Sequence, residues 1–192
     1  MTAERCPRCL FSQRVCLCAE VPSIATHTRV VIVRHHREQL RSSNTGRLAH
    51  LALPNSVIVE YGGGGEATGR RGLAVLPPLE GAWLLFPAGE PVTQAPVPPP
   101  KQLVVLDATW SQARRMYRKL DGLRGLPILR LPDEPMPAAR LRTSPGPGQV
   151  STIEAIARAL RLLEGDAVAA SLEQLFQVAV SRAQSMGRQL KQ

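Results

Sequence analysis

Short runs of aliphatic and β-branched residues alternate with longer amphipathic stretches along most of the chain. The apolar runs are too short for helices and are rich in Val, Ile and Leu, which is typical of buried strands. We expect strands at residues 28–33, 56–61, 82–86, 103–106 and, more weakly, 128–131. The intervening patterns predict helices at residues 37–53 (with a break near Asn44), from Trp110 onward, at 152–164 and at 168–189.

Strands that alternate with helices predict an α/β fold with a mainly parallel sheet and flanking helices. In open sheets of this kind, ligands bind beyond the carboxyl ends of the strands. We interpret the proline-rich residues 91–100 as an extended surface connection, and the glycines at 62–65 as a flexible break. No segment approaches the roughly 18 uncharged apolar residues of a membrane span. Residues 1–14 also lack an apolar signal stretch, so we expect a cytoplasmic protein with no membrane partner.

All four cysteines lie near the N-terminus in the pattern C-x2-C-x6-C-x-C, formed by Cys6, Cys9, Cys16 and Cys18. Two close pairs joined by a short loop suit tetrahedral coordination of one Zn²⁺, and four thiolates leave the metal no open position for catalysis. Two disulfides are the alternative, which a reducing cytosol disfavours; a redox dithiol needs only one C-x-x-C. We therefore expect a structural four-cysteine zinc knuckle at residues 1–26 and an α/β domain at residues 27–192.

Net charge is the next informative property, because 24 Lys and Arg residues outnumber 15 Asp and Glu residues and give +9 at neutral pH. Most of the cations are arginines, whose planar guanidinium suits phosphate contacts and base stacking. A GC-rich genome explains a high ratio of Arg to Lys, but not the excess of positive charge. The charge favours nucleic-acid binding, with an acidic membrane surface or simple solubility as competing interpretations.

The loop after the predicted strand at 103–106 contains a carboxylate at a helix start. Thr109 and Gln112 have the spacing of a capping box, which predicts that a helix begins at Trp110. Asp107 then stands at the strand end, near the positive end of that helix. It is either a helix-capping acid or a carboxylate directed into a cleft. Trp110 is likewise either a core anchor or a platform for a ligand.

Two further loops have unusual polar residues. Ser151 and Glu154 form a second capping box behind the glycine-containing residues 146–148, and such a helix start suits an anion such as an amino-acid carboxylate. The third loop, residues 42–47, contains small hydroxyl and amide side chains near arginines, which suit phosphate or a base edge. Alternatively, Asn44 caps a helix that starts at Thr45.

Taken in order, the motifs of this chain resemble the DTW-domain family. They are C-x2-C…C-x-C, H-x-x-E (His35 to Glu38), S-N-T-G-R (Ser43 to Arg47), F-P-x-x-E (Phe86 to Glu90), D-x-T-W (Asp107 to Trp110) and S-T-x-E-A (Ser151 to Ala155). Together they span Cys6 to about Leu160. The chain departs from the family pattern at His36, where proline is frequent, and at Ala108, where glycine or serine is frequent. Compared with the family pattern, the proline-rich segment before Lys101 looks like a local insertion.

This resemblance implies a tRNA-uridine aminocarboxypropyltransferase related to the knotted SPOUT class of RNA-modifying enzymes. The implied fold is SPOUT-like with a C-terminal trefoil knot. The implied reaction transfers the 3-amino-3-carboxypropyl group of S-adenosylmethionine to N3 of a tRNA uridine and releases 5′-methylthioadenosine. Its partners are then tRNA and S-adenosylmethionine, with structural Zn²⁺.

The resemblance also implies roles for particular residues. Asp107 is the candidate catalytic base, or the acceptor that orients the uracil N3–H. The expected cosubstrate-binding residues are Phe86, Pro87, Glu90, Asp107, Thr109, Trp110, Arg142, Ser151, Thr152 and Glu154. Among these, Ser151, Thr152 and Arg142 are expected to hold the methionyl carboxylate and Glu90 its ammonium group. The expected RNA contacts are His35, Arg41, Ser43, Asn44, Thr45, Arg47, Arg114 and Arg115; His35 is alternatively a structural histidine.

Three other functions fit the same residues. A SPOUT-type RNA methyltransferase would use the same cosubstrate but transfer its methyl group. A non-catalytic zinc-containing RNA-binding module would bind RNA with a steep salt dependence and consume no cosubstrate. An aminocarboxypropyltransferase acting on ribosomal RNA would differ only in its acceptor.

Overall fold

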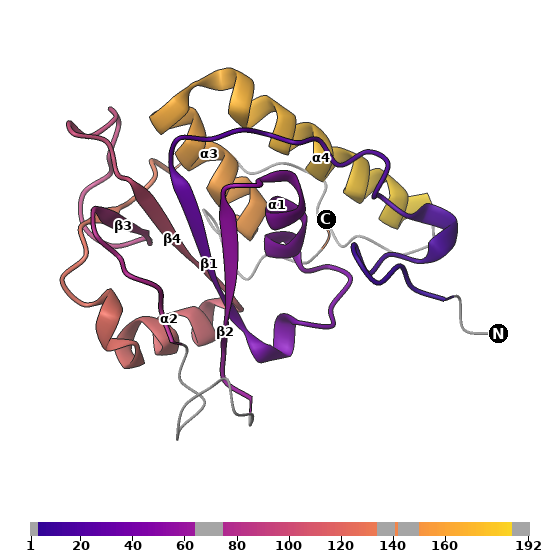
Figure 1. The fold of residues 1–192 in the computed structure, drawn as a ribbon, viewed down its shortest axis with the longest axis horizontal. Coiled ribbons are helices and arrows are strands. Elements are labelled where there is room, and N and C mark those ends of the chain that lie inside the picture. The colour runs from indigo at the N-terminus through magenta and orange to yellow at the C-terminus, as the bar shows by residue number, and fades with distance from the viewer. Residues whose placement is uncertain (1–3, 64–74, 134–140, 142–149, 186–192) are drawn as a thin grey trace.

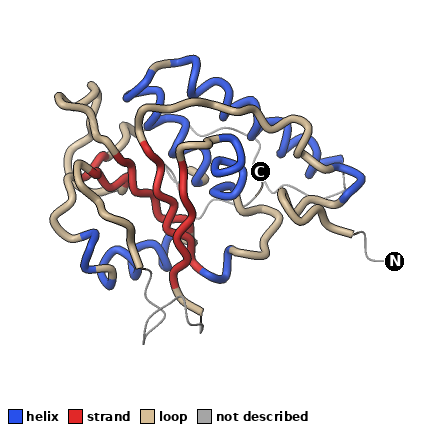
Figure 2. Tube along the Cα trace, viewed as in Figure 1, coloured by secondary structure: helices blue, strands red, loops and turns tan. Residues whose placement is uncertain are grey.

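A computed structural model of the chain describes residues 4–63, 75–133, 141 and 150–185. Within them, a parallel sheet has the strand order β2-β1-β4-β3-β5 and is flanked by helices (Figures 1 and 2). The strands are β1 (Arg29–His35), β2 (Ser56–Tyr61), β3 (Ala82–Leu85), β4 (Gln102–Asp107) and β5 (Ile128–Leu129). The α-helices are α1 (Thr45–Ala52), α2 (Trp110–Lys119), α3 (Thr152–Glu164) and α4 (Asp166–Ser185). The predicted α/β fold with a parallel sheet is confirmed.

Helices cover both faces of the sheet. Alternate side chains of a strand point to opposite faces, so Val30 and Ile32 pack with α1, α3 and α4 on one face. Val31 and Val33 pack on the other face with Met116 of α2. Figure 1 shows this separation, with α2 on one side of the strands and α1, α3 and α4 on the other. The sheet is therefore the middle layer of three.

The cysteine-containing segment shares the core of the larger face. Phe11 and Leu17 are fully buried in the same cluster as the residues of α3 and α4. The Arg182 guanidinium on α4 donates to the Cys16 carbonyl oxygen at 2.9 Å and to a carboxylate oxygen of Glu20 at 2.7 Å. The segment thus packs directly on α4, and its treatment as a separate domain at residues 1–26 stays a prediction.

Side chains at the helix starts explain where the helices begin. The Asn44 Oδ1 accepts from the Arg47 N–H at 2.8 Å and caps α1, while Thr109 and Gln112 form the predicted capping box of α2. A carboxylate oxygen of Glu154 accepts from the Ser151 N–H at 2.8 Å at the start of α3. These bonds satisfy backbone donors that have no partner within the helix.

Element boundaries differ from the predictions where tertiary contacts extend or shorten a local pattern. The predicted helical region at 37–53 is a 3₁₀ turn (His36–Glu38) followed by α1, so the break near Asn44 is confirmed. The strand predicted at 128–131 has only its first two residues paired with β3.

The predicted trefoil knot would involve residues 142–149, which lie outside the described residues, so it stays a prediction. Among the described helices, none is both long and apolar enough to cross a membrane.

Candidate active site

Because all the strand pairings are parallel, the carboxyl ends of the strands meet at one edge of the sheet. Asp107 is the last residue of β4, which lies between β1 and β3. The helices α1 and α3 both begin near this edge, since the first turn of each contacts Asp107 through a side chain at its start. This edge therefore brings all three predicted polar loops together.

The Asp107 carboxylate joins the starts of two helices. Its Oδ2 accepts from the Asn44 Nδ2 at 2.5 Å, and its Oδ1 accepts from the Thr152 Oγ1 at 2.7 Å. The side chain is buried, with 4% of the residue exposed. We call Asn44, Asp107 and Thr152 the carboxylate clamp. Both oxygens of Asp107 thus have protein donors, which fixes the orientation of the carboxylate.

Gly46 completes the clamp by its lack of a side chain. It lies in the first turn of α1, where a Cβ would be 2.6 Å from both Cγ and Oδ2 of Asp107. No real Cβ approaches other heavy atoms so closely, so glycine is required by this packing. The glycine of the S-N-T-G-R motif therefore admits the carboxylate to the first turn of α1, where the helix dipole favours negative charge.

Burial raises the pKa of Asp107 above its ordinary value, because desolvation disfavours the charged form. The hydrogen bonds from Asn44 and Thr152 act in the opposite direction and are smaller in effect. Arg34, which is its partner in register on β1, also lowers the pKa. A buried carboxyl with a raised pKa is characteristic of functional sites as well as of structural networks.

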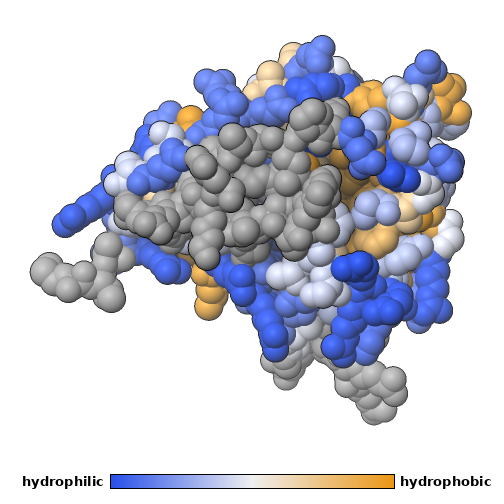
Figure 3. Space-filling view, turned by 180° about the vertical axis from the view of Figure 1, so that it is seen from behind, coloured by the Kyte–Doolittle hydropathy of each residue, from blue (hydrophilic) through white to orange (hydrophobic). Residues whose placement is uncertain are grey.

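A cavity with a volume of about 180 Å³ opens beside this clamp. This is room for several water molecules, or for a fragment of amino-acid size. It is lined by Leu85, Phe86, Pro87, Val105, Leu106, Ala108, Trp110, Ala113, Arg130, Leu131, Pro132, Asp133, Val150, Ser151, Thr152, Ala155 and Arg158. The rear view in Figure 3 shows apolar residues gathered on the right, the side of β3 and α2, within a mostly hydrophilic surface.

The cavity is apolar on most sides and charged in two places. Near β5, the Arg130 Nη1 donates to the Gly89 carbonyl oxygen at 2.8 Å, and its Nη2 lies 3.4 Å from a carboxylate oxygen of Asp133. On α3, Ser151 and Thr152 lie at the positive end of the helix, and Arg158 follows on the same wall. Apolar walls with a few convergent polar groups are typical of small-molecule sites.

The structure brings some of the predicted cosubstrate residues together and leaves others apart. The predicted residues that line the cavity are Phe86, Pro87, Trp110, Ser151 and Thr152. Four predicted residues do not line it: Glu90, Asp107, Thr109 and Glu154. Glu90 is exposed, and Glu154 is buried as a cap of α3. Arg142 lies outside the described residues. Whether any of these residues binds the cosubstrate stays a prediction.

The predicted RNA contacts divide by exposure. Arg41, Arg114 and Arg115 are exposed, whereas Asn44 and Thr45 are buried. Thr45 accepts from the Ile153 N–H at 3.4 Å, so this residue also joins α1 to α3.

The remaining predicted RNA contacts are partly buried: His35, Ser43 and Arg47. The Arg47 guanidinium donates to the carbonyl oxygens of Arg8 and Gln39, and the His35 Nδ1 accepts from the Arg37 N–H. These residues have structural contacts that the sequence did not predict, and their contact with RNA stays a prediction.

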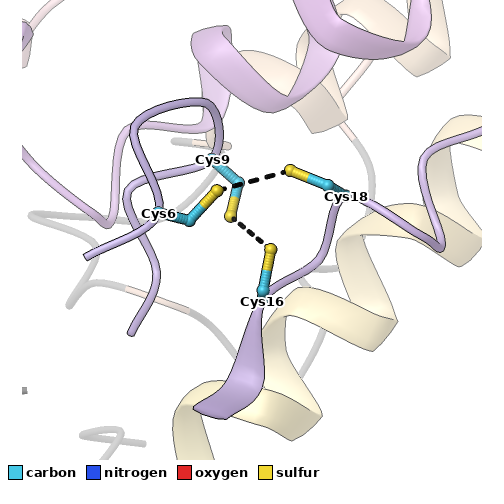
Figure 4. A group of neighbouring side chains, drawn as sticks. All are labelled: Cys6, Cys9, Cys16 and Cys18. Atoms are coloured by element: carbon cyan, nitrogen blue, oxygen red, sulfur yellow. Dashed lines mark hydrogen bonds between the residues drawn. The ribbon is translucent and has the colours of Figure 1, made fainter. Parts of the chain in front are cut away.

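The four cysteines point their sulfur atoms at one another, as Figure 4 shows. All four Sγ atoms lie within 4.8 Å of one another; Cys6 and Cys18 are 3.6 Å apart, and Cys9 and Cys16 are 3.7 Å apart. Zn–S bonds of about 2.3 Å in a tetrahedron require sulfur–sulfur distances of about 3.8 Å. The group can therefore hold a metal ion, and its geometry fits a tetrahedral site.

Electrostatics at the cysteines also fit a cation. Backbone N–H groups of Cys9 and Arg8 lower the pKa of the Cys6 thiol to about 6, whereas burial raises the pKa of the Cys18 thiol to about 12. Four thiolates this close together repel one another, and a divalent cation among them removes that cost.

The sequence assigned no role to the three charged residues of the cavity wall, Arg130, Asp133 and Arg158, and gave Gly46 only as part of the S-N-T-G-R motif. The spacing of Ser151, Ala155 and Arg158 on one helical face was a signal that could have identified Arg158. The other three depend on contacts between segments far apart in the sequence, and no local pattern identifies them.

Residues 3–184 match the sequence profile described as "DTW domain". The chain belongs to the DTW domain family. The matched range includes the cysteine group, the carboxylate clamp and the cavity, so this DTW domain occupies nearly the whole chain.

Curated relatives of this DTW domain are named tRNA-uridine aminocarboxypropyltransferase 2. The Drosophila melanogaster protein is 29% identical over 168 residues, which cover 84% of this chain and 67% of that protein. The Mus musculus protein is 30% identical over 176 residues, covering 84% of this chain and 58% of that protein. The chain thus spans about two thirds of the fly relative and little more than half of the mouse relative.

A solved structure shares the fold of the DTW domain. It is the SAM-dependent rRNA:acp-transferase Tsr3 from Vulcanisaeta distributa, with a TM-score of 0.53, 20% sequence identity, and coverage of 86% of this chain and 82% of that chain. At this level of identity the likeness concerns the fold alone.

Proposed function

We propose that this DTW domain transfers the 3-amino-3-carboxypropyl group of S-adenosylmethionine to N3 of a uridine in tRNA and releases 5′-methylthioadenosine. The observation that carries the proposal is the family match over residues 3–184, which includes both the clamp and the cavity. Two relatives named for this activity on tRNA uridine match over 84% of the chain.

The cavity supports binding of part of S-adenosylmethionine. That cosubstrate supplies a sulfonium, an excellent leaving group, attached to the carbon chain that is transferred. Trp110, Phe86 and Pro87 provide apolar walls, and the start of α3 provides the positive end of a helix dipole, which favours a carboxylate. Transfer of this chain in place of the methyl group requires that the amino-acid end be held in a fixed position.

Two roles are open to Asp107. In the first, it accepts the proton of the uracil N3 as the nitrogen attacks, and its raised pKa suits it to this role. In the second, it acts through Asn44 and Thr152 and holds the starts of α1 and α3 in place. The second role is supported by the two hydrogen bonds that occupy its oxygens and by the absence of Asp107 from the described cavity wall.

The pH dependence of kcat separates the two roles of Asp107. A base that must be ionised gives a rate that rises with pH through its pKa, whereas a positioning residue gives no such limb. Asp107→Asn would abolish transfer in the first case. It would reduce transfer in parallel with protein stability in the second.

We also propose that the cysteine group holds one structural Zn²⁺, with Cys6, Cys9, Cys16 and Cys18 as ligands. The sulfur distances support this assignment, as does the burial of Cys6 and Cys9. Four thiolates complete the coordination, so the metal would stabilise the segment that packs on α4 without entering the reaction.

Contacts to tRNA are proposed at the exposed arginines near the site: Arg41 on the loop before α1, and Arg114 and Arg115 on α2. Guanidinium groups at these positions suit phosphate oxygens, which provide affinity without sequence selection. Selection of the particular uridine would then depend on contacts between the base and residues at the edge of the cavity.

The experiment that tests the function uses mass spectrometry of nucleosides from tRNA incubated with the protein and S-adenosylmethionine labelled at the carboxyl carbon. We expect labelled 3-(3-amino-3-carboxypropyl)uridine and an equal amount of methylthioadenosine. Methyl-labelled cosubstrate run in parallel detects a methyltransferase, since only then does the methyl label enter RNA. Labelling of ribosomal RNA but not tRNA would show that the acceptor is ribosomal RNA. RNA binding without labelling of any RNA would contradict an enzyme of either kind.

A further inference from the structure

The α3 wall of the cavity contains a cation that neither the family match nor the relatives' names assign. Arg158 lines the cavity together with Ser151, Thr152 and Ala155. These residues are spaced by three and four positions along α3, so they share one face of the helix. Arg158 itself is partly buried, as expected for a side chain whose stem packs along a cavity wall.

Helix geometry directs the Arg158 side chain toward the start of α3. In an α-helix each Cα–Cβ bond tilts toward the N-terminus, so a long side chain covers the preceding turn. The preceding turn here contains Ala155, and the turn before it contains Ser151 and Thr152. The guanidinium and the positive end of the helix dipole therefore act on the same part of the cavity.

The other described cation of the cavity lies on a different wall. Arg130 donates to the Gly89 carbonyl oxygen and forms an ion pair with Asp133 at the end of β5. The β5 wall therefore presents a cation and a carboxylate together, and Arg158 places a second cation on the α3 wall, behind Ser151 and Thr152.

We infer that Arg158 binds the carboxylate of the methionyl group of S-adenosylmethionine and thereby positions the aminocarboxypropyl chain for transfer. This inference rests on the proposed function. An Arg–carboxylate pair can form two parallel hydrogen bonds, which fix orientation as well as position. Arg158 thus takes the ionic role that the sequence predicts for Arg142.

Ligands that differ by the carboxylate test the inference. Binding of S-adenosylmethionine, decarboxylated S-adenosylmethionine and 5′-methylthioadenosine is measured by calorimetry for the wild type, Arg158→Met and Arg158→Lys. Arg118→Met, which removes an exposed arginine of α2, is the matched control. We expect Arg158→Met to weaken S-adenosylmethionine binding by about tenfold to a hundredfold, the usual effect of losing a charge-assisted pair. Binding of the two ligands without the carboxylate should be unchanged, and Lys should restore part of the loss.

The kinetic readout should agree with the binding data. If the carboxylate contact also aligns the carbon under attack, Arg158→Met lowers kcat in addition to raising KM for S-adenosylmethionine. Equal weakening of all three ligands would overturn the inference, because it would indicate general damage to the cavity. Unchanged affinity for S-adenosylmethionine would also overturn it, while leaving the proposed function intact. A wild-type protein that bound none of the three ligands would contradict the proposed function itself, and the inference with it.

Discussion

Gly46 lies against the carboxylate of Asp107 so closely that a Cβ at position 46 would be 2.6 Å from both Cγ and Oδ2. One residue belongs to the first turn of α1 and the other to the end of β4, and the contact lets a buried acid approach a helix start. The Asn44 side chain joins the same two elements, because its Oδ1 accepts from the Arg47 N–H of α1 and its Nδ2 donates to Asp107. The clamp is therefore a single packed unit whose parts depend on one another.

Substitution of Gly46 tests this packing. Alanine in an exposed helix position stabilises by about 1 kcal/mol relative to glycine, but Gly46→Ala must displace Asp107, and overpacking costs about 1–3 kcal/mol. We expect a net loss of stability in denaturant unfolding and a loss of transfer activity. The matched control is Gly122→Ala, whose Cβ would meet, among the described residues, only the terminal Cδ1 of the flexible Leu76 side chain at 2.9 Å. A Gly46→Ala protein as stable and active as this control would show that the clamp tolerates movement.

The raised pKa of Asp107 predicts how stability depends on pH. Because burial raises the pKa of this carboxyl in the folded state, the folded protein holds the proton at pH values where the unfolded chain has released it. The stability of the wild type relative to Asp107→Asn should therefore fall as pH rises above about 4, by up to about 1.4 kcal/mol per pH unit. The fall should stop once pH exceeds the folded-state pKa. Urea unfolding of both proteins across this range provides the measurement, and a difference that does not change with pH would contradict it.

Metal removal should affect the whole domain rather than the cysteine segment alone. Phe11 and Leu17 of that segment are fully buried beside α4, and Arg182 binds its backbone. We expect about one zinc per chain by elemental analysis. Chelation or Cys9→Ser should lower the free energy of unfolding by more than about 2 kcal/mol, whereas Ser12→Ala in the same segment should have little effect. Protein that purifies without metal and melts normally in chelator would exclude the zinc site.

The salt dependence of tRNA binding tests the arginines of α2. Each phosphate contact that is lost should lower the slope of log affinity against log salt by about 1. We expect this decrease for Arg114→Gln and for Arg115→Gln, both of which remove exposed charges. Lys101→Gln removes an exposed charge just before the amino end of β4, at the opposite edge of the sheet, and should leave the slope unchanged. Equal slopes for all of these proteins would place the RNA elsewhere.

Local patterns predicted much of this molecule. Runs such as the one at 103–106 predicted strands, because a strand that is covered on both faces of the sheet needs apolar side chains at every position. The capping box of Thr109 and Gln112 predicted the first residue of α2, because the helix leaves those backbone N–H groups unpaired. The spacing of the cysteines predicted a tetrahedral sulfur group, since two short pairs fold back on themselves with few possible geometries.

What the sequence by itself determined, then, is the set of strands and helices, their starts and the metal-binding group, all of which depend on residues close together in the chain. The tertiary structure alone decided which polar residues share a site. Asn44 lies 63 positions before Asp107, and Thr152 lies 45 positions after it. Their meeting depends on β4 lying beside β1 and on the packing of α1 against α3. Periodicity is a property of neighbouring residues, whereas strand order and helix packing arise from burial of the whole core, so local patterns could not show that these side chains bind one carboxylate.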